Sequence, residues 1–186
     1  MFKKLVCILF LIFVSCGSQT HDFNGSDITQ ANLNSNLVLK SQSGEILDSK
    51  SLQGNVLAVF FGFTHCPDIC PTTLGELKQI KLLLKTPEKF KVLFISVDPE
   101  RDTVENLKDY IPQFGENIYG LTGSPEEIKK VADQYKVFYQ KVSQGSDYTI
   151  DHSAGVYLID TNGKVRVRHP YGSDIEKIAE DINNLF

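Results

Sequence analysis

The sequence predicts one α/β domain in which helices flank a mixed central sheet, and three observations predict it. Two continuous apolar runs, residues 56–63 and 90–97, are typical of strands buried on both faces of a sheet. Between them, residues 72–85 carry apolar side chains at helical spacing, which completes a βαβ unit with parallel strands. Residues 161–164 form a strong hairpin turn into a strand at 165–168, which adds antiparallel pairing.

The remaining elements follow from turn and capping signals. Residues 37–40 and 45–48 predict an N-terminal β-hairpin across a polar turn. Ser124 and Glu127 form a capping box with Pro125 at the first helical position. The other expected elements are a helix at 103–114 whose last turn Pro112 disturbs, a capped helix ending near 135, strands at 137–142 and 154–160, and a last helix that Ser173 caps and that ends at 185.

The first residues have the pattern of an export signal. Two lysines precede an apolar run at 5–14 that is too short for an ordinary membrane span. We expect residues 1–15 to be a lipoprotein signal peptide and Cys16 to be acylated as the first mature residue. A plain signal with an incidental cysteine, or an uncleaved anchor, is the alternative. The polar residues 16–35 are expected to be a flexible tether and residues 36–186 the folded domain.

Export of the chain would change its net charge and would place it in an oxidising compartment. Removal of Lys3 and Lys4 with the signal changes the net charge from −4 to −6, and an acidic domain is a poor candidate for nucleic-acid binding. We expect a membrane-anchored lipoprotein that faces the periplasm or another extracytoplasmic space. Such compartments are oxidising, so a close thiol pair tends to become a disulfide there unless it is kept reduced.

Cys66 and Cys70 are the cysteines of the expected domain, because Cys7 and Cys16 belong to the export segment. A thiol pair at a strand-to-helix junction points to a thioredoxin-like architecture. We expect Cys70 at the helix N-cap, where the helix dipole favours a thiolate, the form that attacks disulfides and binds soft metals. Three residues separate the cysteines, one more than in ordinary thioredoxin-type motifs, which leaves room for both sulfurs to bind one ion. A structural Cys66–Cys70 disulfide is the alternative, although so short a loop stabilises little.

Two sulfurs make an incomplete site for most metals, so a metal bound by Cys66 and Cys70 needs a third ligand, and a histidine is the candidate. In the proposed fold, the loop that enters the strand at 154 passes beside the thiol motif, and this selects His152. His65 adjoins Cys66 and is expected to pack in the loop or to support a ligand without binding the metal itself, and His169 is expected on the surface. Two sulfurs and an imidazole fit Cu(I), and also Zn(II) with a water. Asp151 either orients His152 or caps a turn.

Four stretches carry a family resemblance, at residues 61–71, 96–103, 120–123 and 147–153. With them the chain resembles the SCO/SenC family of copper-binding assembly proteins for cytochrome c oxidase. The resemblance implies a thioredoxin-like fold that binds one copper ion, with Cu(I) favoured over Cu(II), through Cys66, Cys70 and His152. It also implies copper delivery to, or thiol reduction at, the dinuclear copper centre of oxidase subunit II or a related copper protein. Asp98 is expected either to help contact that partner or to cap the helix that follows.

A copper metallochaperone is therefore the leading hypothesis, and three others remain. A thiol-disulfide oxidoreductase that reduces a dedicated copper-protein partner is the first alternative. Residues 143–153 lack the proline that such enzymes place opposite their thiols, which favours metal handling. A peroxidase is disfavoured because residues 62–76 contain no basic partner for a reactive cysteine. A redox sensor that uses the thiol pair as a switch cannot be separated from the oxidoreductase by sequence.

Overall fold

The structure is a computed structural model that describes residues 22–186. The expected signal peptide and the expected lipidation of Cys16 lie outside the described residues. None of the described helices has the length and apolar character that a bilayer crossing requires.

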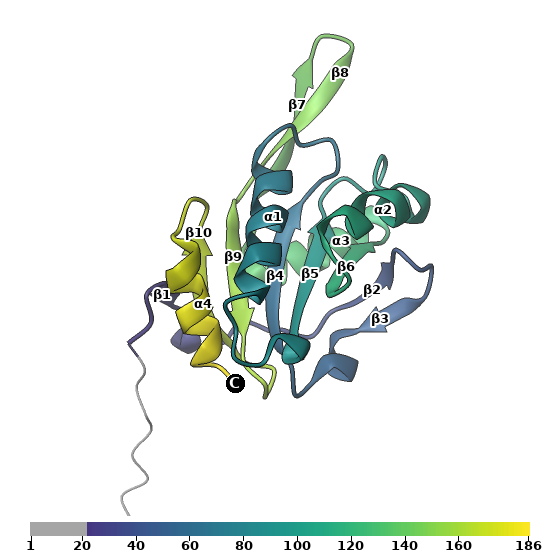
Figure 1. Cartoon of the computed structure of the whole chain (residues 1–186). Coiled ribbons are helices and arrows are strands. Elements are labelled where there is room, and N and C mark those ends of the chain that lie inside the picture. Colours follow the sequence, from purple (N-terminus) through teal and green to yellow (C-terminus); the bar gives the residue numbers. More distant parts are fainter. Residues whose placement is uncertain (1–21) are drawn as a thin grey trace, which may run out of the picture.

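A mixed sheet of eight strands forms the centre of the domain (Figure 1). Its strand order is β1-β10-β9-β4-β5-β6-β2-β3, and the neighbours β4, β5 and β6 run parallel. The strands are β1 Ser26–Asp27, β2 Val38–Ser41, β3 Ile46–Asp48, β4 Val56–Gly62, β5 Phe90–Ser96, β6 Ile118–Thr122, β9 Gly155–Ile159 and β10 Val165–Pro170. The βαβ unit, the N-terminal hairpin β2–β3 and the final antiparallel pair are confirmed.

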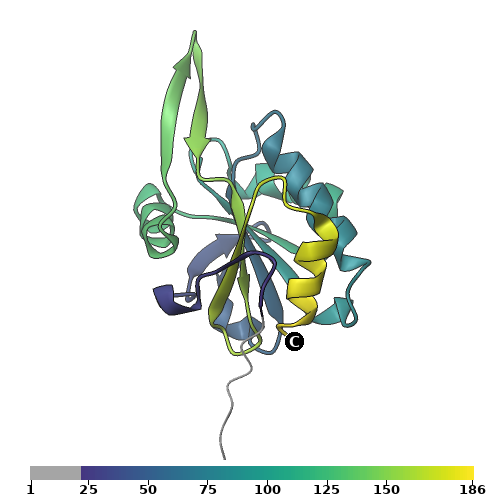
Figure 2. The same ribbon diagram turned by 90° about the vertical axis from the view of Figure 1, so that its left-hand side faces the viewer.

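Four helices cover the two faces of this sheet: α1 Ile69–Lys81, α2 Val104–Tyr110, α3 Pro125–Tyr135 and α4 Ile175–Asn183. Helices α1 and α4 lie on one face and α3 lies on the other (Figure 2). The capping box of Ser124 and Glu127 is present. Proline 112 ends α2 in a 3₁₀ turn at Ile111–Phe114, as expected. The last helix is capped by Asp174 instead of Ser173, since the Asp174 side chain accepts the amides of Glu176 and Lys177.

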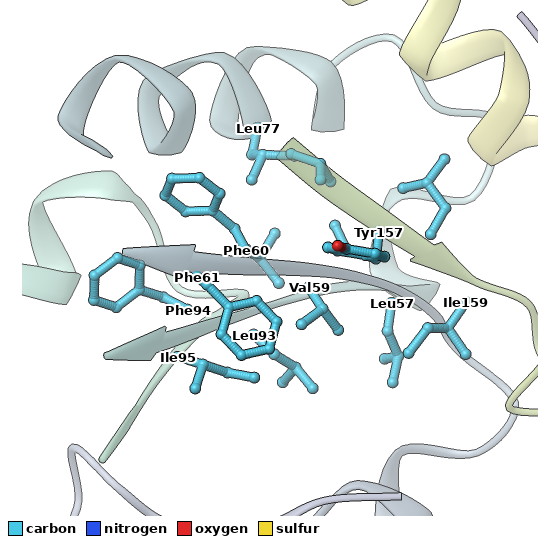
Figure 3. Packing of buried hydrophobic residues seen from close by; sticks show 14 of the residues in the cluster. Leu57, Val59, Phe60, Phe61, Leu77, Leu93, Phe94, Ile95, Tyr157 and Ile159 are labelled. Atoms are coloured by element: carbon cyan, nitrogen blue, oxygen red, sulfur yellow. The ribbon is translucent and has the colours of Figure 1, made fainter. Parts of the chain in front are cut away.

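The core explains why β4 reads as a continuous apolar run. Every residue of β4 is buried, because helices pack on both faces of this central strand. Phe60 points toward α1, where Leu77 packs, and Phe61 points to the opposite face (Figure 3). There Phe61 meets Tyr135 of α3 at a centroid distance of 5.5 Å. Each such side chain contributes about 1.5–3 kcal/mol by leaving water, so the end of β4 is held firmly in place.

The folded domain begins earlier than the sequence predicts. Residues 24–35, expected to belong to the tether, include β1, which pairs with β10. The backbone amides of Asn24 and Gly25 both donate to the carboxylate of Asp181 at 2.9 Å. The sequence misses this boundary because the segment is polar and its partners lie more than 130 residues away.

The predicted surface position of His169 is wrong. Its side chain is 2% exposed, and Nε2 lies 2.8 Å from Asp181 Oδ2. The cause is β1, which covers the outer side of β10 and makes it an internal strand. Burial lowers the pKa of His169, while Asp181 works in the opposite direction.

Two strands, β7 Tyr139–Gln144 and β8 Asp147–His152, form a separate antiparallel hairpin that we call the arm. The arm projects from the domain beyond the start of α1 (Figures 1 and 2). The expected strand at 137–142 is thus a strand of the arm and not of the central sheet. Neither β8 nor β6 is predicted from the sequence, because both are short and mix polar with apolar residues.

Candidate metal centre

The thiol motif lies in the loop between β4 and α1. Gly62 ends β4 directly beneath the sulfur of Cys70, where there is no room for a side chain. A Cβ at this position would lie 2.8 Å from Cys70 Sγ and 2.8 Å from a ring atom of Phe94. The chain then turns, and the Cys66 amide donates to the Phe63 carbonyl at 3.2 Å. The strand end therefore brings the motif close to the core.

Helix α1 begins at Ile69, earlier than the sequence predicts. Pro71 is tolerated in the first turn because the amides there have no helical partner. Cys70 is therefore not the N-cap but the second helical residue, with a fully buried side chain. The N-cap is Asp68, whose side chain makes no capping hydrogen bond, and Cys66 Sγ accepts the Cys70 amide at 3.4 Å instead. The helix N-terminus thus favours the thiolate of Cys66 and not that of Cys70.

His152 completes the cluster from the arm. Its Nε2 lies 3.8 Å from Cys70 Sγ, and the two sulfurs and one ring nitrogen of the three residues lie within 4.8 Å of one another. Its ring packs edge-on against Phe63 at a centroid distance of 5.9 Å. Its Nδ1 lies 3.2 Å from the carbonyl of Ser153, so Nδ1 carries the proton and Nε2 keeps a lone pair for a metal.

The two thiols have opposite electrostatics. The pKa of Cys66 is lowered to about 4, chiefly because the Cys70 thiol donates a hydrogen bond to its sulfur. The pKa of Cys70 is raised, because the same hydrogen bond and complete burial both favour its thiol form. Both cysteines are free. One sulfur is thus ready to bind a soft metal, and the second loses its proton when an ion binds.

Two further predicted residues do not reach the cluster. Asp151 is exposed, and no hydrogen bond joins it to His152. Neighbouring residues of a strand point to opposite faces, so His152 faces the domain and Asp151 faces solvent. His65 is exposed, and its Nδ1 pairs with the Thr64 hydroxyl at 3.0 Å.

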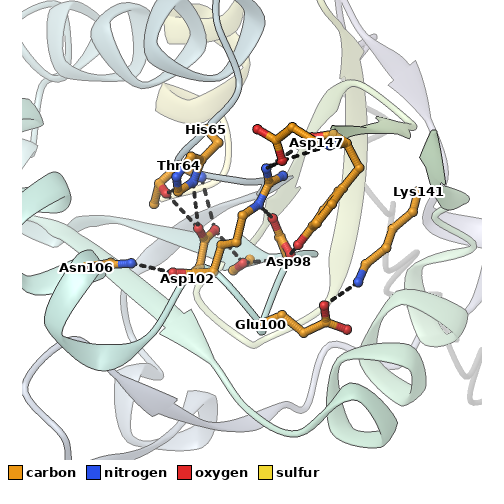
Figure 4. Close-up of polar contacts among 11 residues, drawn as sticks. Thr64, His65, Asp98, Glu100, Asp102, Asn106, Lys141 and Asp147 are labelled. Atoms are coloured by element: carbon orange, nitrogen blue, oxygen red, sulfur yellow. Dashed lines mark hydrogen bonds and ion pairs between the residues drawn. The ribbon is translucent and has the colours of Figure 1, made fainter. Parts of the chain in front are cut away.

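Asp98 is placed differently from either expectation. Its side chain is fully buried and therefore offers no surface for a partner. It does not cap the next helix either, because Thr103 is the N-cap of α2. Instead Asp98 accepts hydrogen bonds from Arg101 and from the hydroxyl of Tyr148 at 2.8 Å (Figure 4).

Asp102 is a supporting residue that no sequence pattern indicates. It is fully buried, and it accepts the Thr64 amide at 3.0 Å and the Thr64 and Ser96 hydroxyls at 2.6 Å. Burial raises its pKa. These bonds hold the thiol loop two residues before Cys66. The aspartate lies in a stretch that resembles the family, but only the fold shows that it faces the thiol loop.

A surface pocket of about 380 Å³ opens beside the cluster. Cys66 and His152 line it, together with Phe63, Pro67 and Ile69. Cys70 lies beneath it and does not contribute to its surface. A ligand or partner therefore reaches the cluster from the side of Cys66 and His152.

Comparisons with known proteins find a matching family model, similar curated proteins and similar solved structures. The family model described as SCO1/SenC matches residues 25–186. The SCO2-like protein of Rickettsia conorii is 42% identical over 150 residues, which cover 78% of this chain and 73% of that protein. The structure of Arabidopsis thaliana ScoI with copper bound matches with a TM-score of 0.75 and 38% identity, covering 80% of this chain and 94% of that one.

A solved structure without metal matches as well. Apo Sco1 of Thermus thermophilus has a TM-score of 0.78 and 32% identity, covering 90% of this chain and 99% of that one. These matches confirm the thioredoxin-like α/β fold. The family match also begins close to β1, in agreement with the early start of the folded domain.

Proposed function

The chain belongs to the SCO1/SenC family, and we propose that it binds one copper ion through Cys66, Cys70 and His152 and delivers it to a copper enzyme. The observation that carries the proposal is the convergence of two sulfurs and one imidazole nitrogen within 4.8 Å, from a loop, a helix and the arm. The copper-bound relative from Arabidopsis thaliana supports copper as the metal.

The donor chemistry favours Cu(I). Thiolates are soft ligands that prefer Cu(I), and three donors suffice for it. Zn(II) would require a fourth ligand, such as water from the adjoining pocket. Because Cys66 has a low pKa, binding requires the loss of only the Cys70 proton near neutral pH.

The acceptor we propose is the dinuclear copper centre of cytochrome c oxidase subunit II or of a related copper protein. The resemblance of the four sequence stretches supports this choice. The open side of the cluster is compatible with transfer, since an acceptor can approach Cys66 and His152.

The test is an anaerobic Cu(I) titration against a calibrated chelator. The soluble domain from residue 22 should be compared with Cys66→Ser, Cys70→Ser and His152→Ala, and Cys7 and Cys16 are absent from this fragment. We expect one copper per domain, with an affinity that falls by about 100-fold or more in each variant. His65→Ala is the matched control and should bind like wild type. Unchanged affinity in the His152→Ala variant would refute the site.

Thiol reduction of the same partner is the second candidate, and the unequal pKa values of the two thiols favour it. A Cys66 thiolate beside a buried Cys70 resembles the attacking and resolving pair of a dithiol reductant. Cys66 would attack the partner's disulfide, and Cys70 would then displace the partner's second thiol and leave a Cys66–Cys70 disulfide. Metal-free reduction of an oxidised subunit II fragment, lost in Cys66→Ser, is the supporting result.

We further propose that the protein is exported and anchored by a lipid on Cys16. The basic start, the short apolar run and the cysteine after it support this. Mass spectrometry of the mature N-terminus should find acylated Cys16, and Cys16→Ser should release the domain from the membrane. A mature chain that begins elsewhere would refute it.

A further inference from the structure

His152 belongs to the arm, which packs little against the domain. All of β7 beyond Tyr139 is exposed, and Ile150 is the only fully buried residue of β8. A two-stranded hairpin is marginally stable in water by itself. The position of His152 therefore depends on the contacts that hold the arm to its neighbours.

The turn after β5 supplies the polar contacts, which add to the apolar packing of Ile150 and of the His152 ring on Phe63. The guanidinium carbon of Arg101 lies 3.8 Å from the centre of the Tyr148 ring, and Arg101 Nη1 donates to the Tyr148 carbonyl at 3.0 Å. Asp98 accepts from Arg101 Nε and from the Tyr148 hydroxyl. On the other strand of the arm, Lys141 pairs with Glu100 (Figure 4).

Burial separates this network from ordinary surface pairs. The Asp98 side chain is fully buried and that of Arg101 is 18% exposed, whereas Lys141 and Glu100 are 46% and 62% exposed. A buried carboxylate is stable only with its partners in place. The planar guanidinium of an arginine also fixes the directions of its hydrogen bonds, whereas the ammonium group of a lysine does not. Arg101 and Asp98 thus define where the arm lies, and the Lys141 pair adds little.

The same turn holds the thiol loop. Asp102, next to Arg101, accepts the amide and hydroxyl of Thr64. Residues 98–102 therefore contact both segments that form the metal site. They contact the thiol loop through Thr64 and the arm through Tyr148. Neither contact involves an atom that would touch the metal.

We propose that Arg101 is a positioning residue which, through Asp98 and Tyr148, holds the arm where His152 completes the metal site. The inference rests on the proposed copper binding and adds to it. His152 ligation depends on a network that lies outside the set of ligands.

A double-mutant cycle tests whether Arg101 acts through His152. Cu(I) affinity is measured for Arg101→Lys, for His152→Ala and for the double variant. We expect Arg101→Lys to weaken binding about tenfold, as supporting residues around metal ligands do. In the His152→Ala background the same change should have no further effect. Equal losses in both backgrounds would overturn the proposal.

Arg166→Lys is the matched control. Arg166 pairs with Asp160 at 2.9 Å in a partly buried contact, at the opposite end of β9 from His152. The Arg166→Lys variant should leave the copper affinity unchanged. Tyr148→Phe serves as a milder variant should Arg101→Lys fail to fold, since it removes only the hydroxyl bond to Asp98. It should weaken binding about threefold in the wild-type background and not at all in the His152→Ala background.

Two readouts do not depend on affinity. In the metal-free protein, amide hydrogen exchange of residues 148–152 should be about tenfold faster in Arg101→Lys and unchanged in Arg166→Lys. With Cu(II) bound, the nitrogen hyperfine pattern of the electron paramagnetic resonance spectrum should weaken in Arg101→Lys. Unchanged exchange and an unchanged spectrum would overturn the proposal. Failure of wild type to bind copper would instead refute the proposed function, and the exchange experiment would still decide whether Arg101 holds the arm.

Discussion

The thiol loop and the arm bring ligands to the same place but are built in different ways. The loop continues from β4, a strand with no exposed residue, and Cys70 is fully buried. The arm is exposed over most of its length and is held by a few polar contacts. The difference teaches that the sulfurs are fixed by the core, whereas the imidazole is held largely by polar contacts between residues 98–101 and the arm.

Asp102→Ala should have the largest effect, because it removes the support of the thiol loop. It leaves three donors without their acceptor: the buried hydroxyl of Ser96 and the partly buried amide and hydroxyl of Thr64. We expect the free energy of unfolding to fall by about 3 kcal/mol, together with a loss of Cu(I) affinity. Urea denaturation of the metal-free domain measures the first effect. A loss below about 1 kcal/mol would contradict the role of Asp102 as the support of this loop.

Asp102→Asn tests the same support through pH. Burial raises the pKa of Asp102 above its ordinary value of 3.8, so the folded state holds this proton to higher pH than the unfolded state does. The stability that Asp102 contributes relative to asparagine should therefore be largest below pH 3.8 and decline as pH rises through the raised pKa. Denaturation of both proteins from pH 3 to 7 measures the difference, and an increase with pH would contradict it.

Gly62→Ala should have the next largest effect. The new methyl group would lie 2.8 Å from both Cys70 Sγ and a ring atom of Phe94, and both neighbours are fully buried. We expect a loss of about 2 kcal/mol in unfolding free energy, typical of an overpacked core. Gly75→Ala is the control, since a Cβ there meets nothing within 4 Å. Equal stability of the two variants would show that the strand end can shift.

Alkylation should separate the two thiols. At pH 6 we expect iodoacetamide to modify Cys66 at least about tenfold faster than Cys70, because Cys66 is ionised and partly exposed. The Cys66 rate should hold down to roughly pH 5 and fall as pH drops through about 4. Peptide mass spectrometry of the metal-free domain measures both rates. Faster modification of Cys70 would reverse the proposed assignment of the thiolate.

Asp151→Asn should have the smallest effect. Its side chain is exposed and faces away from His152, so Cu(I) affinity should change by less than about twofold. The same competition titration checks it. A larger loss would show that the arm turns when metal binds and brings Asp151 toward the imidazole.

The parts of the molecule that the sequence predicts well are those with strong local signals. The continuous apolar runs predict β4 and β5, the capping box predicts α3, and the thiol pair with His152 predicts the cluster. His152 is predictable because the fold class fixes which loop passes the thiols. Local pattern is sufficient for such features.

The misses arise where distant pairing decides the outcome. His169 reads as an edge residue until β1 is known to cover β10, and its buried partner Asp181 comes from another element, α4. The exchange of roles between Cys66 and Cys70 depends on where α1 begins, and Pro71 makes that ambiguous. Arg101 and Tyr148 are 47 residues apart, so the network of the arm is invisible to any local pattern.

The burial of Cys70 also has a kinetic consequence. If copper is bound as proposed, an incoming ligand would reach it from the side of Cys66 and His152, because Cys70 lies beneath the pocket. Exchange by stepwise substitution would then start with one of those two bonds, and the bond to Cys70 would break last. The buried sulfur would therefore keep the ion on the protein until an acceptor had supplied replacement ligands, which would protect the ion from escape into solvent.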